Sequence, residues 1–202
     1  MRRRNLIYSL IFFLLFLVVM VLVLTSCTEG FDNAIYQFVI SFRSPALDTL
    51  FTTITRLGNT GTILLLIIIF VLAFKNRESL YLVISALDCF LLNTILKYII
   101  QRARPDGLRL IVQGGYSFPS GHAMMSICVY GYLLYFSICH IKNKVLKYIV
   151  SILLVLVILS IGISRIYVGV HYASDVLAGY LLACSYLLLL IEVMRKYNAL
   201  KG

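Results

Sequence analysis

The sequence is short of charge: only 13% of its 202 residues are charged, whereas 61% are hydrophobic. Soluble domains keep about a quarter of their residues charged, so an ordinary soluble domain is excluded. The apolar residues also come in blocks long enough to cross a bilayer, which takes about 20 residues of helix. We therefore expect an all-α integral membrane protein with a single membrane-embedded domain over residues 1–202.

Paired cysteines and acidic clusters are also missing. The five cysteines include no CxxC pair, and most lie in apolar runs, which predicts neither a disulfide framework nor a zinc site. The part of the chain expected outside the cytoplasm carries no acidic cluster of the kind that binds Mg²⁺. The net charge of +10 would suggest nucleic acid in a soluble protein, but in a membrane protein Lys and Arg mark cytoplasmic loops. We expect no metal, no other cofactor and no nucleic-acid partner.

Six apolar segments are predicted to span the membrane. They cover residues of about 5–27, 58–74, 79–99, 121–141, 148–165 and 172–192. The first has features of a signal peptide, but it is long for that role and five segments follow it, so we expect a retained helix. Residues 28–60 show apolar residues at helical spacing and a Ser44-Pro45 start signal. This predicts two short helices at the membrane surface.

The basic residues predict the orientation. Eleven of the eighteen Lys and Arg residues lie before the first span, after the second span, between the fourth and fifth spans, or after the sixth span. The positive-inside rule then places both termini in the cytoplasm. The other seven lie on the opposite side, where topology does not require them: Arg43, Arg56, Lys97, Arg102, Arg104, Arg109 and Arg165. We expect a multi-pass protein of the plasma membrane whose extracytoplasmic face carries a functional site.

Three clusters of polar residues lie near the outer ends of different spans, so they can converge at one depth. They are KYIIQRARP (97–105), PSGH (119–122) and SRIYVGVHYASD (164–175). If the third helix continues to Pro105, Lys97 and Arg104 share one of its faces. Together with Arg165 they would provide fixed cations, which suit phosphate oxygens.

The start of the fourth helix strengthens the prediction of a phosphate site. Ser120 is a candidate N-cap, and Gly121 would let a ligand approach the backbone. The free N–H groups of a first helical turn also bind anions.

Two of the three histidines fall in these clusters, whereas His140 lies near the cytoplasmic end of its span. His171 and Asp175 are four residues apart, so a helix that starts near His171 would place them on one face. A carboxylate behind an imidazole fixes its tautomer and prepares the far nitrogen to attack. A lone histidine is more often structural, but His122 and His171 beside three cations favour catalysis.

Asp88 lies midway along the third span. It is expected to be protonated or paired across helices, with a structural role favoured.

Together these residues resemble the type 2 phosphatidic acid phosphatase (PAP2) superfamily. Its signature is Lys-x6-Arg-Pro, then Pro-Ser-Gly-His, then Ser-Arg-x5-His-x3-Asp. Every fixed position is matched, by Lys97, Arg104 and Pro105, by Pro119, Ser120, Gly121 and His122, and by Ser164, Arg165, His171 and Asp175. The resemblance covers about residues 30–195.

The resemblance implies a metal-independent lipid phosphatase. His171 would form a phosphohistidine, Asp175 would orient it, and His122 would protonate the leaving oxygen and then help to activate water. The phosphoryl oxygens would be held by Lys97, Arg104, Ser120, Gly121 and Arg165. Candidate substrates are undecaprenyl diphosphate, phosphatidylglycerophosphate and phosphatidic acid, with no obligate protein partner.

Two alternatives remain open at this point. A lipid phosphotransferase would use the same phosphohistidine with an acceptor other than water. A non-enzymatic lipid-binding or transport protein belongs to another class, but it would not need His122 and Asp175.

Overall fold

The protein is seen in a computed structural model that describes residues 2–200, with side chains described for residues 4–197. All regular elements in this range are helical, which confirms the all-α prediction. The α-helices are α1 (Arg2–Leu24), α2 (Glu29–Ile40), α3 (Pro45–Ile54), α4 (Thr60–Phe74), α5 (Arg77–Ile100), α6 (Gly121–Ser126), α7 (Tyr132–His140), α8 (Lys144–Tyr167) and α9 (Ala173–Leu200). A 3-10 turn, η1 (Thr55–Gly58), joins α3 to α4, and a π-helical turn, η2 (Ile127–Gly131), joins α6 to α7.

Five helical segments in the described residues are long and apolar enough to cross a membrane. They are Arg4–Leu24, Arg77–Ile100, Gly121–His140, Lys144–Tyr167 and Ala173–Tyr197. At 1.5 Å per residue, 24 residues of helix reach about 36 Å, enough for the hydrocarbon core. The predicted span 58–74 is weaker, because α4 has only 15 residues. It counts as a sixth span only together with Pro45–Gly58, from which it is bent by 50°.

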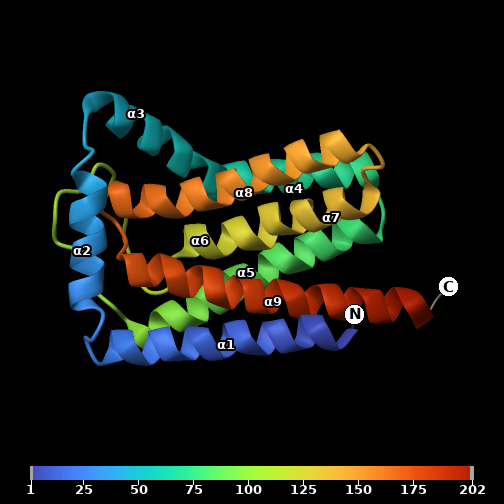
Figure 1. Cartoon of the computed structure of the whole chain (residues 1–202), viewed down its shortest axis with the longest axis horizontal. Coiled ribbons are helices and arrows are strands. Elements are labelled where there is room, and N and C mark those ends of the chain that lie inside the picture. Colours follow the sequence, from blue (N-terminus) through green and yellow to red (C-terminus); the bar gives the residue numbers. More distant parts are fainter. Residues whose placement is uncertain (1, 201–202) are drawn as a thin grey trace.

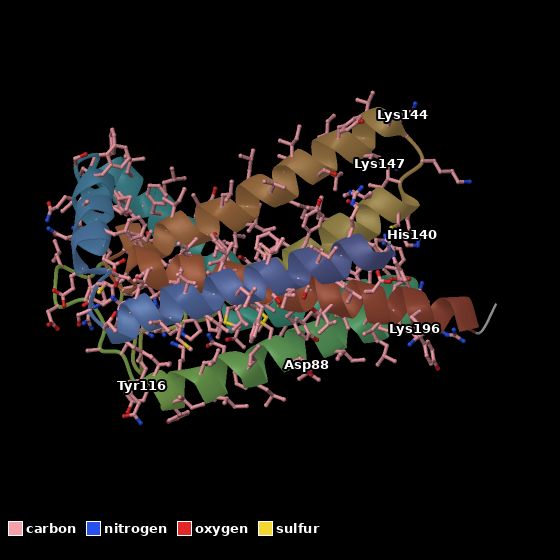
Figure 2. All side chains as sticks on the ribbon, turned by 60° about the horizontal axis from the view of Figure 1, so that its bottom comes forward. Asp88, Tyr116, His140, Lys144, Lys147 and Lys196 are labelled. Carbon is pink, nitrogen blue, oxygen red and sulfur yellow. The ribbon has the colours of Figure 1, made fainter. Side chains whose placement is uncertain are left out.

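The long helices lie side by side, and α2 lies across one end of the bundle (Figure 1). Both ends of the chain lie at the other end. Lys144, Lys147, His140 and Lys196 gather at the end where the chain terminates, whereas Tyr116 lies at the opposite end (Figure 2). We call the end with α2 and Tyr116 the α2 end. The labelled lysines therefore lie at the end of the bundle opposite Tyr116.

At the site, the ends of α5 and α9 agree with the predicted spans 79–99 and 172–192 to within one residue, but the condition that the third helix continues to Pro105 is not met. The helix α5 does not continue to Pro105, because it ends at Ile100 and Gln101 is left-handed, with φ 51°. Residues 101–120 carry no helix, and Pro105 itself disfavours helical backbone at the preceding residue. The helix α9 begins at Ala173, so His171 lies two residues before its first turn.

The predicted capping residues had different outcomes. Ser44 caps α3 as expected, since its Oγ accepts a bond from the Leu47 N–H at 3.3 Å and Pro45 takes the first helical position. Ser120 occupies the N-cap position of α6, but its hydroxyl makes no capping bond. That hydroxyl is free for another partner.

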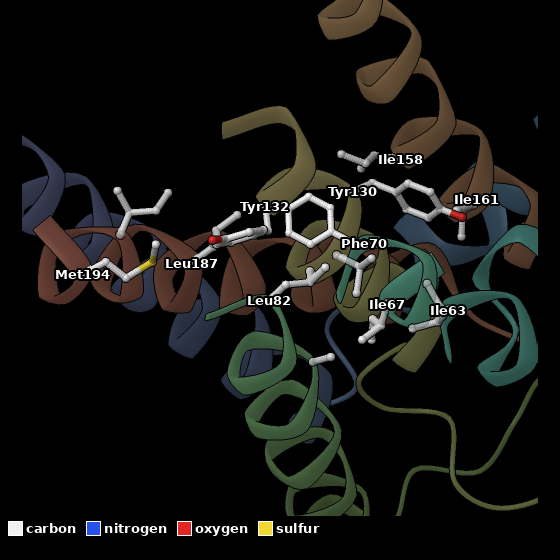
Figure 3. Packing of buried hydrophobic residues seen from close by; sticks show 13 residues of the cluster. Ile63, Ile67, Phe70, Leu82, Tyr130, Tyr132, Ile158, Ile161, Leu187 and Met194 are labelled. Atoms are coloured by element: carbon white, nitrogen blue, oxygen red, sulfur yellow. The ribbon is translucent and has the colours of Figure 1, made fainter. Parts of the chain in front are cut away.

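The main apolar core lies where α4, α5, the α6–α7 span, α8 and α9 meet (Figure 3). Buried side chains from all of these segments contribute to it, among them Ile63, Phe70, Leu82, Tyr132, Ile161 and Leu187. Lipid tails are as apolar as leucine, so close packing of small residues and hydrogen bonds between helices must add to helix association. The α1–α9 contact has both, because Ser9 and Ser185 each donate a hydroxyl to the other's carbonyl oxygen at 2.8 Å.

Candidate active site

The structure brings the predicted site residues together at one cavity. This cavity, of about 570 Å³, lies between α4, α5 and α6, and near the α2 end it is lined by Lys97, Arg104, Gly121, His122 and His171. The three clusters of the sequence therefore converge. The remaining predicted residues, Ser120, Arg165 and Asp175, are buried behind this lining.

The hydrogen bonds of His171 define its tautomer. Its Nε2 lies 3.1 Å from Arg104 Nη1, and a guanidinium can only donate. Nε2 therefore accepts, and the ring proton sits on Nδ1. Nδ1 faces Ser117 Oγ at 3.3 Å and Asp175 Oδ2 at 3.5 Å.

Ser117 is a site residue that sequence reasoning missed. Its Oγ donates to Asp175 Oδ2 at 2.5 Å and so lies between the carboxylate and the imidazole. The backbone N–H of Tyr172 donates to the same oxygen at 2.9 Å. No spacing signal in the sequence points to Ser117, because it comes from the irregular segment 101–120 and meets Asp175 only in the fold.

Burial keeps His171 neutral. It lowers the pKa of His171 to about 3; the nearby Asp175 raises the pKa, and Arg165 and Arg104 lower it further. At neutral pH the imidazole thus carries a lone pair on Nε2, the form that a nucleophile requires.

Lys97 and Arg104 meet although the helix between them ends early. Both donate to the carbonyl oxygen of Tyr116, Arg104 through Nη2 at 3.1 Å. Arg104 Nε also donates to the carbonyl of Gly115 at 2.9 Å. Gly115 has φ +70°, a conformation that side-chain-bearing residues rarely adopt. One guanidinium therefore folds the 114–116 turn and contacts His171.

Arg165 and Ser120 retain buried polar atoms with unused hydrogen-bonding capacity. Arg165 is 1% exposed, and it donates to Thr55 Oγ1 at 2.7 Å and Gln113 Oε1 at 3.0 Å. Its Nε and the Ser120 Oγ have no hydrogen-bond partner among the described residues. Buried donors are normally paired, so these two atoms fit a site that receives an anion.

His122 is positioned by the break between η1 and α4. Its Nε2 lies 2.9 Å from Asn59 Oδ1. Gly58 packs so closely that a Cβ there would lie 2.7 Å from His122 Cδ2. Neither residue was predicted, since both come from a connection distant in sequence.

Asp88 lies outside the site. Tyr186 of α9 donates to its Oδ2 at 2.7 Å, which agrees with the expected pairing across helices. Its label in Figure 2 lies between the two ends of the bundle, away from Tyr116 at the α2 end.

The helices are long enough to span a membrane, and the site holds a neutral histidine among fixed cations. This combination is typical of membrane enzymes that hydrolyse phosphate esters. Comparison with known proteins agrees. Residues 78–199 match the family model of the PAP2 superfamily. The chain belongs to this superfamily and is a membrane phosphatase.

One relative by sequence and two solved structures are similar over most of the chain. Phosphatidylglycerophosphatase B of Bacillus subtilis (strain 168) is 35% identical over 176 residues, which are 83% of this chain and 85% of the relative. The crystal structure of a transmembrane PAP2 type phosphatidylglycerolphosphate phosphatase from Bacillus subtilis matches with a TM-score of 0.86 and 33% identity, covering 93% of this chain and 96% of that one. The crystal structure of Aquifex aeolicus LpxE matches with a TM-score of 0.63 and 26% identity, covering 78% of this chain and 93% of that one.

Gly58→Ala tests the contact with His122. The added methyl would overlap the imidazole, so the ring must shift, and we expect turnover to fall about 10- to 100-fold. Gly61→Ala is the matched control, because a Cβ at Gly61 meets nothing within 4 Å. Turnover and the thermal midpoint in detergent measure the effect. Wild-type turnover in Gly58→Ala would show that His122 does not need this position.

Proposed function

We propose that the protein is a lipid phosphatase that removes a terminal phosphate through a phosphohistidine at His171. The observation that carries this proposal is the two-part character of the 570 Å³ cavity. Its walls between α4 and α5 are apolar, with Ile63, Leu64, Ile67, Ala86, Leu87 and Phe90, and they lead to the cations and histidines. A phosphorylated lipid has the same division between tail and headgroup.

In the first chemical step, the lone pair of His171 Nε2 attacks phosphorus and the bond from phosphorus to the lipid oxygen breaks. His122, in its protonated form, gives the leaving oxygen a proton. Such a positioned acid contributes about 10²–10⁴-fold. The Nδ1–H of His171 stays directed at Ser117 and Asp175, which stabilise the positive charge that grows on the ring.

In the second step, water attacks the phosphorus of the phosphohistidine and the P–N bond breaks. Neutral His122 now accepts the proton from water, so both catalytic groups return to their starting forms. Inorganic phosphate leaves, and the covalent route has divided one difficult step into two.

Fixed cations would balance the charge on the phosphoryl oxygens. Lys97, Arg104 and Arg165 provide the positive charge, and the Ser120 hydroxyl and the Gly121 backbone provide further donors. These groups supply the charge neutralisation that Mg²⁺ supplies in many other phosphoryl-transfer sites, which is why we propose a metal-independent reaction.

Phosphatidylglycerophosphate is the first substrate to test. The support comes from the relative named phosphatidylglycerophosphatase B, which is 35% identical over most of both chains. Undecaprenyl diphosphate and phosphatidic acid carry the same kind of headgroup and are the competing candidates.

Phosphate release from purified protein with these three lipids tests both the activity and the substrate. We expect release that survives EDTA, is greatest with phosphatidylglycerophosphate, and is abolished in a folded His171→Ala variant. Wild-type-like turnover in His171→Ala would rule out the phosphohistidine. Transfer of phosphate to an added alcohol in preference to water would instead identify a phosphotransferase.

Leu64→Trp tests whether the apolar walls hold the lipid tail. Leu64 lines the cavity, whereas the neighbouring Leu65 does not; they are 53% and 57% exposed. We expect Leu64→Trp to raise KM for a long-chain lipid phosphate and to leave hydrolysis of a water-soluble phosphate ester unchanged. Leu65→Trp is the matched control. Equal effects of both variants on the lipid would contradict tail binding in this cavity.

We further propose that this single domain lies in the plasma membrane with both termini in the cytoplasm and the active site at the extracytoplasmic face, without an obligate protein partner. In this arrangement α2 lies at the membrane surface. The helix α3 lies there too, unless it forms one bent span with α4. The support is the concentration of basic residues at the end where the chain terminates (Figure 2).

Two exposed cysteines at opposite ends of the bundle test the orientation. Cys27 lies just before α2, and Cys139 lies in the last turn of α7. On intact cells, a membrane-impermeant maleimide should label a variant that retains only Cys27 and leave one that retains only Cys139 unlabelled. The reverse pattern would invert the topology.

A further inference from the structure

The second oxygen of Asp175 has a partner that the proposed reaction does not use. Asp175 is completely buried. Its Oδ2 faces His171 and Ser117, whereas its Oδ1 accepts a bond from Arg102 Nη1 at 2.6 Å. Arg102 is not one of the fixed positions of the sequence motif.

Arg102 is itself held by a second carboxylate. Its Nη2 donates to Asp32 Oδ2 at 2.8 Å and to Thr28 Oγ1 at 3.3 Å, and its guanidinium lies 4.1 Å from the centre of the Tyr172 ring. Asp32 comes from α2 and is 4% exposed. One guanidinium therefore joins two buried carboxylates from different helices.

Asp32 also contacts the start of α9. Its Oδ1 accepts the backbone N–H of Ser174, and its Oδ2 accepts the Ser174 hydroxyl, both at 2.7 Å. The Ser174 hydroxyl lies 2.8 Å from Arg102 Nη1. Asp32, Ser174 and Arg102 thus form a closed network that fixes the first turn of α9, on which Asp175 lies.

We infer that Arg102 and Asp32 are positioning residues: both orient Asp175 behind His171, and Arg102 also weakens the tendency of Asp175 to favour protonation of the ring. This inference rests on the proposed role of His171 as the nucleophile. Arg102 acts through Asp175. Its positive charge offsets the negative charge of the carboxylate, so Asp175 stabilises the protonated, positively charged form of His171 less. Asp32 in turn orients Arg102 and balances part of its charge.

Several charged or polar groups surround His171. Asp175 faces it from α9, Arg104 and Ser117 from the 101–120 segment, and Arg165 from α8. His122 of α6 and Lys97 of α5 line the same cavity. Asp175 is the acidic group closest to the ring, with 3.5 Å between Oδ2 and Nδ1, so Arg102 reaches His171 through the carboxylate that contacts it.

The charge state of Arg102 is consistent with this role. Burial opposes its positive form, but Asp175 and Asp32 together raise the pKa of Arg102 above its ordinary value. The guanidinium is therefore charged at neutral pH.

Arg102→Met is the first test, measured as kcat, KM and the pH dependence of kcat/KM on a water-soluble aryl phosphate. Without the guanidinium, Asp175 stabilises protonated His171, the pKa of the imidazole rises, and the acidic limit of activity moves to higher pH. We expect kcat to fall about 10- to 100-fold, as for other residues that orient a reacting group through hydrogen bonds, with KM changed little.

Three further variants keep the test decisive if Arg102→Met folds poorly. Arg102→Lys retains the charge but not the planar fork, so we expect partial recovery of kcat and a smaller pH shift. Asp32→Asn removes the opposing charge, so the acidic limit should stay in place or move to lower pH. The double variant Arg102→Met/Asp32→Asn should regain thermal stability relative to Arg102→Met, because no unpaired Asp32 carboxylate remains.

Arg109→Met is the matched control. Arg109 lies in the same segment and bonds the Pro105 carbonyl, so kcat and the pH profile should be unchanged. A higher KM with an unshifted pH profile in Arg102→Met would assign Arg102 to headgroup binding and overturn the inference. Unchanged kcat and pH profile in a folded Arg102→Met would also overturn it. If wild-type protein itself released no phosphate, the proposed function would fail first.

Discussion

The buried carboxylate of Asp175 is the constraint on which the α2 end of the bundle depends. An ionised carboxylate without partners is very costly in a low-dielectric interior. Here its two oxygens are occupied by Arg102, Ser117, the Tyr172 N–H and the neighbouring imidazole. These partners come from the 101–120 segment and from the residues just before α9, and α2 adds Asp32 behind Arg102. Satisfying one charge therefore joins three parts of the chain.

Arg104 provides the same kind of organisation on the other side of His171. The segment 101–120 has no regular structure, so its carbonyl groups need partners from outside a helix or sheet. Arg104 supplies donors to Gly114, Gly115 and Tyr116 and also contacts His171 Nε2. The irregular segment is thus ordered by the residue that would bind phosphate, which ties the shape of the site to its chemistry.

Much of this arrangement was predictable from the sequence. Composition and apolar runs predicted the all-α membrane fold, and five of the six predicted spans correspond to helical segments of membrane-crossing length among the described residues, because length and hydropathy are local properties. The weak span 58–74 remained ambiguous, since α4 alone is short. Lys97 and Arg104 would share a helix face only if α5 continued to Pro105, and it does not, because Gln101 takes a left-handed conformation.

The sequence by itself determined the chemical groups of the site and their place at one end of the spans, because the motifs lie next to the ends of the apolar runs. Only the tertiary structure decided which groups touch. Ser117 enters between His171 and Asp175, Asn59 contacts His122, and Asp32 reaches Arg102 from 70 residues away in the chain. These contacts depend on how helices and irregular segments pack, and no local pattern encodes that. Charge pairing in a buried environment selects the partners, and it operates only after the chain has folded.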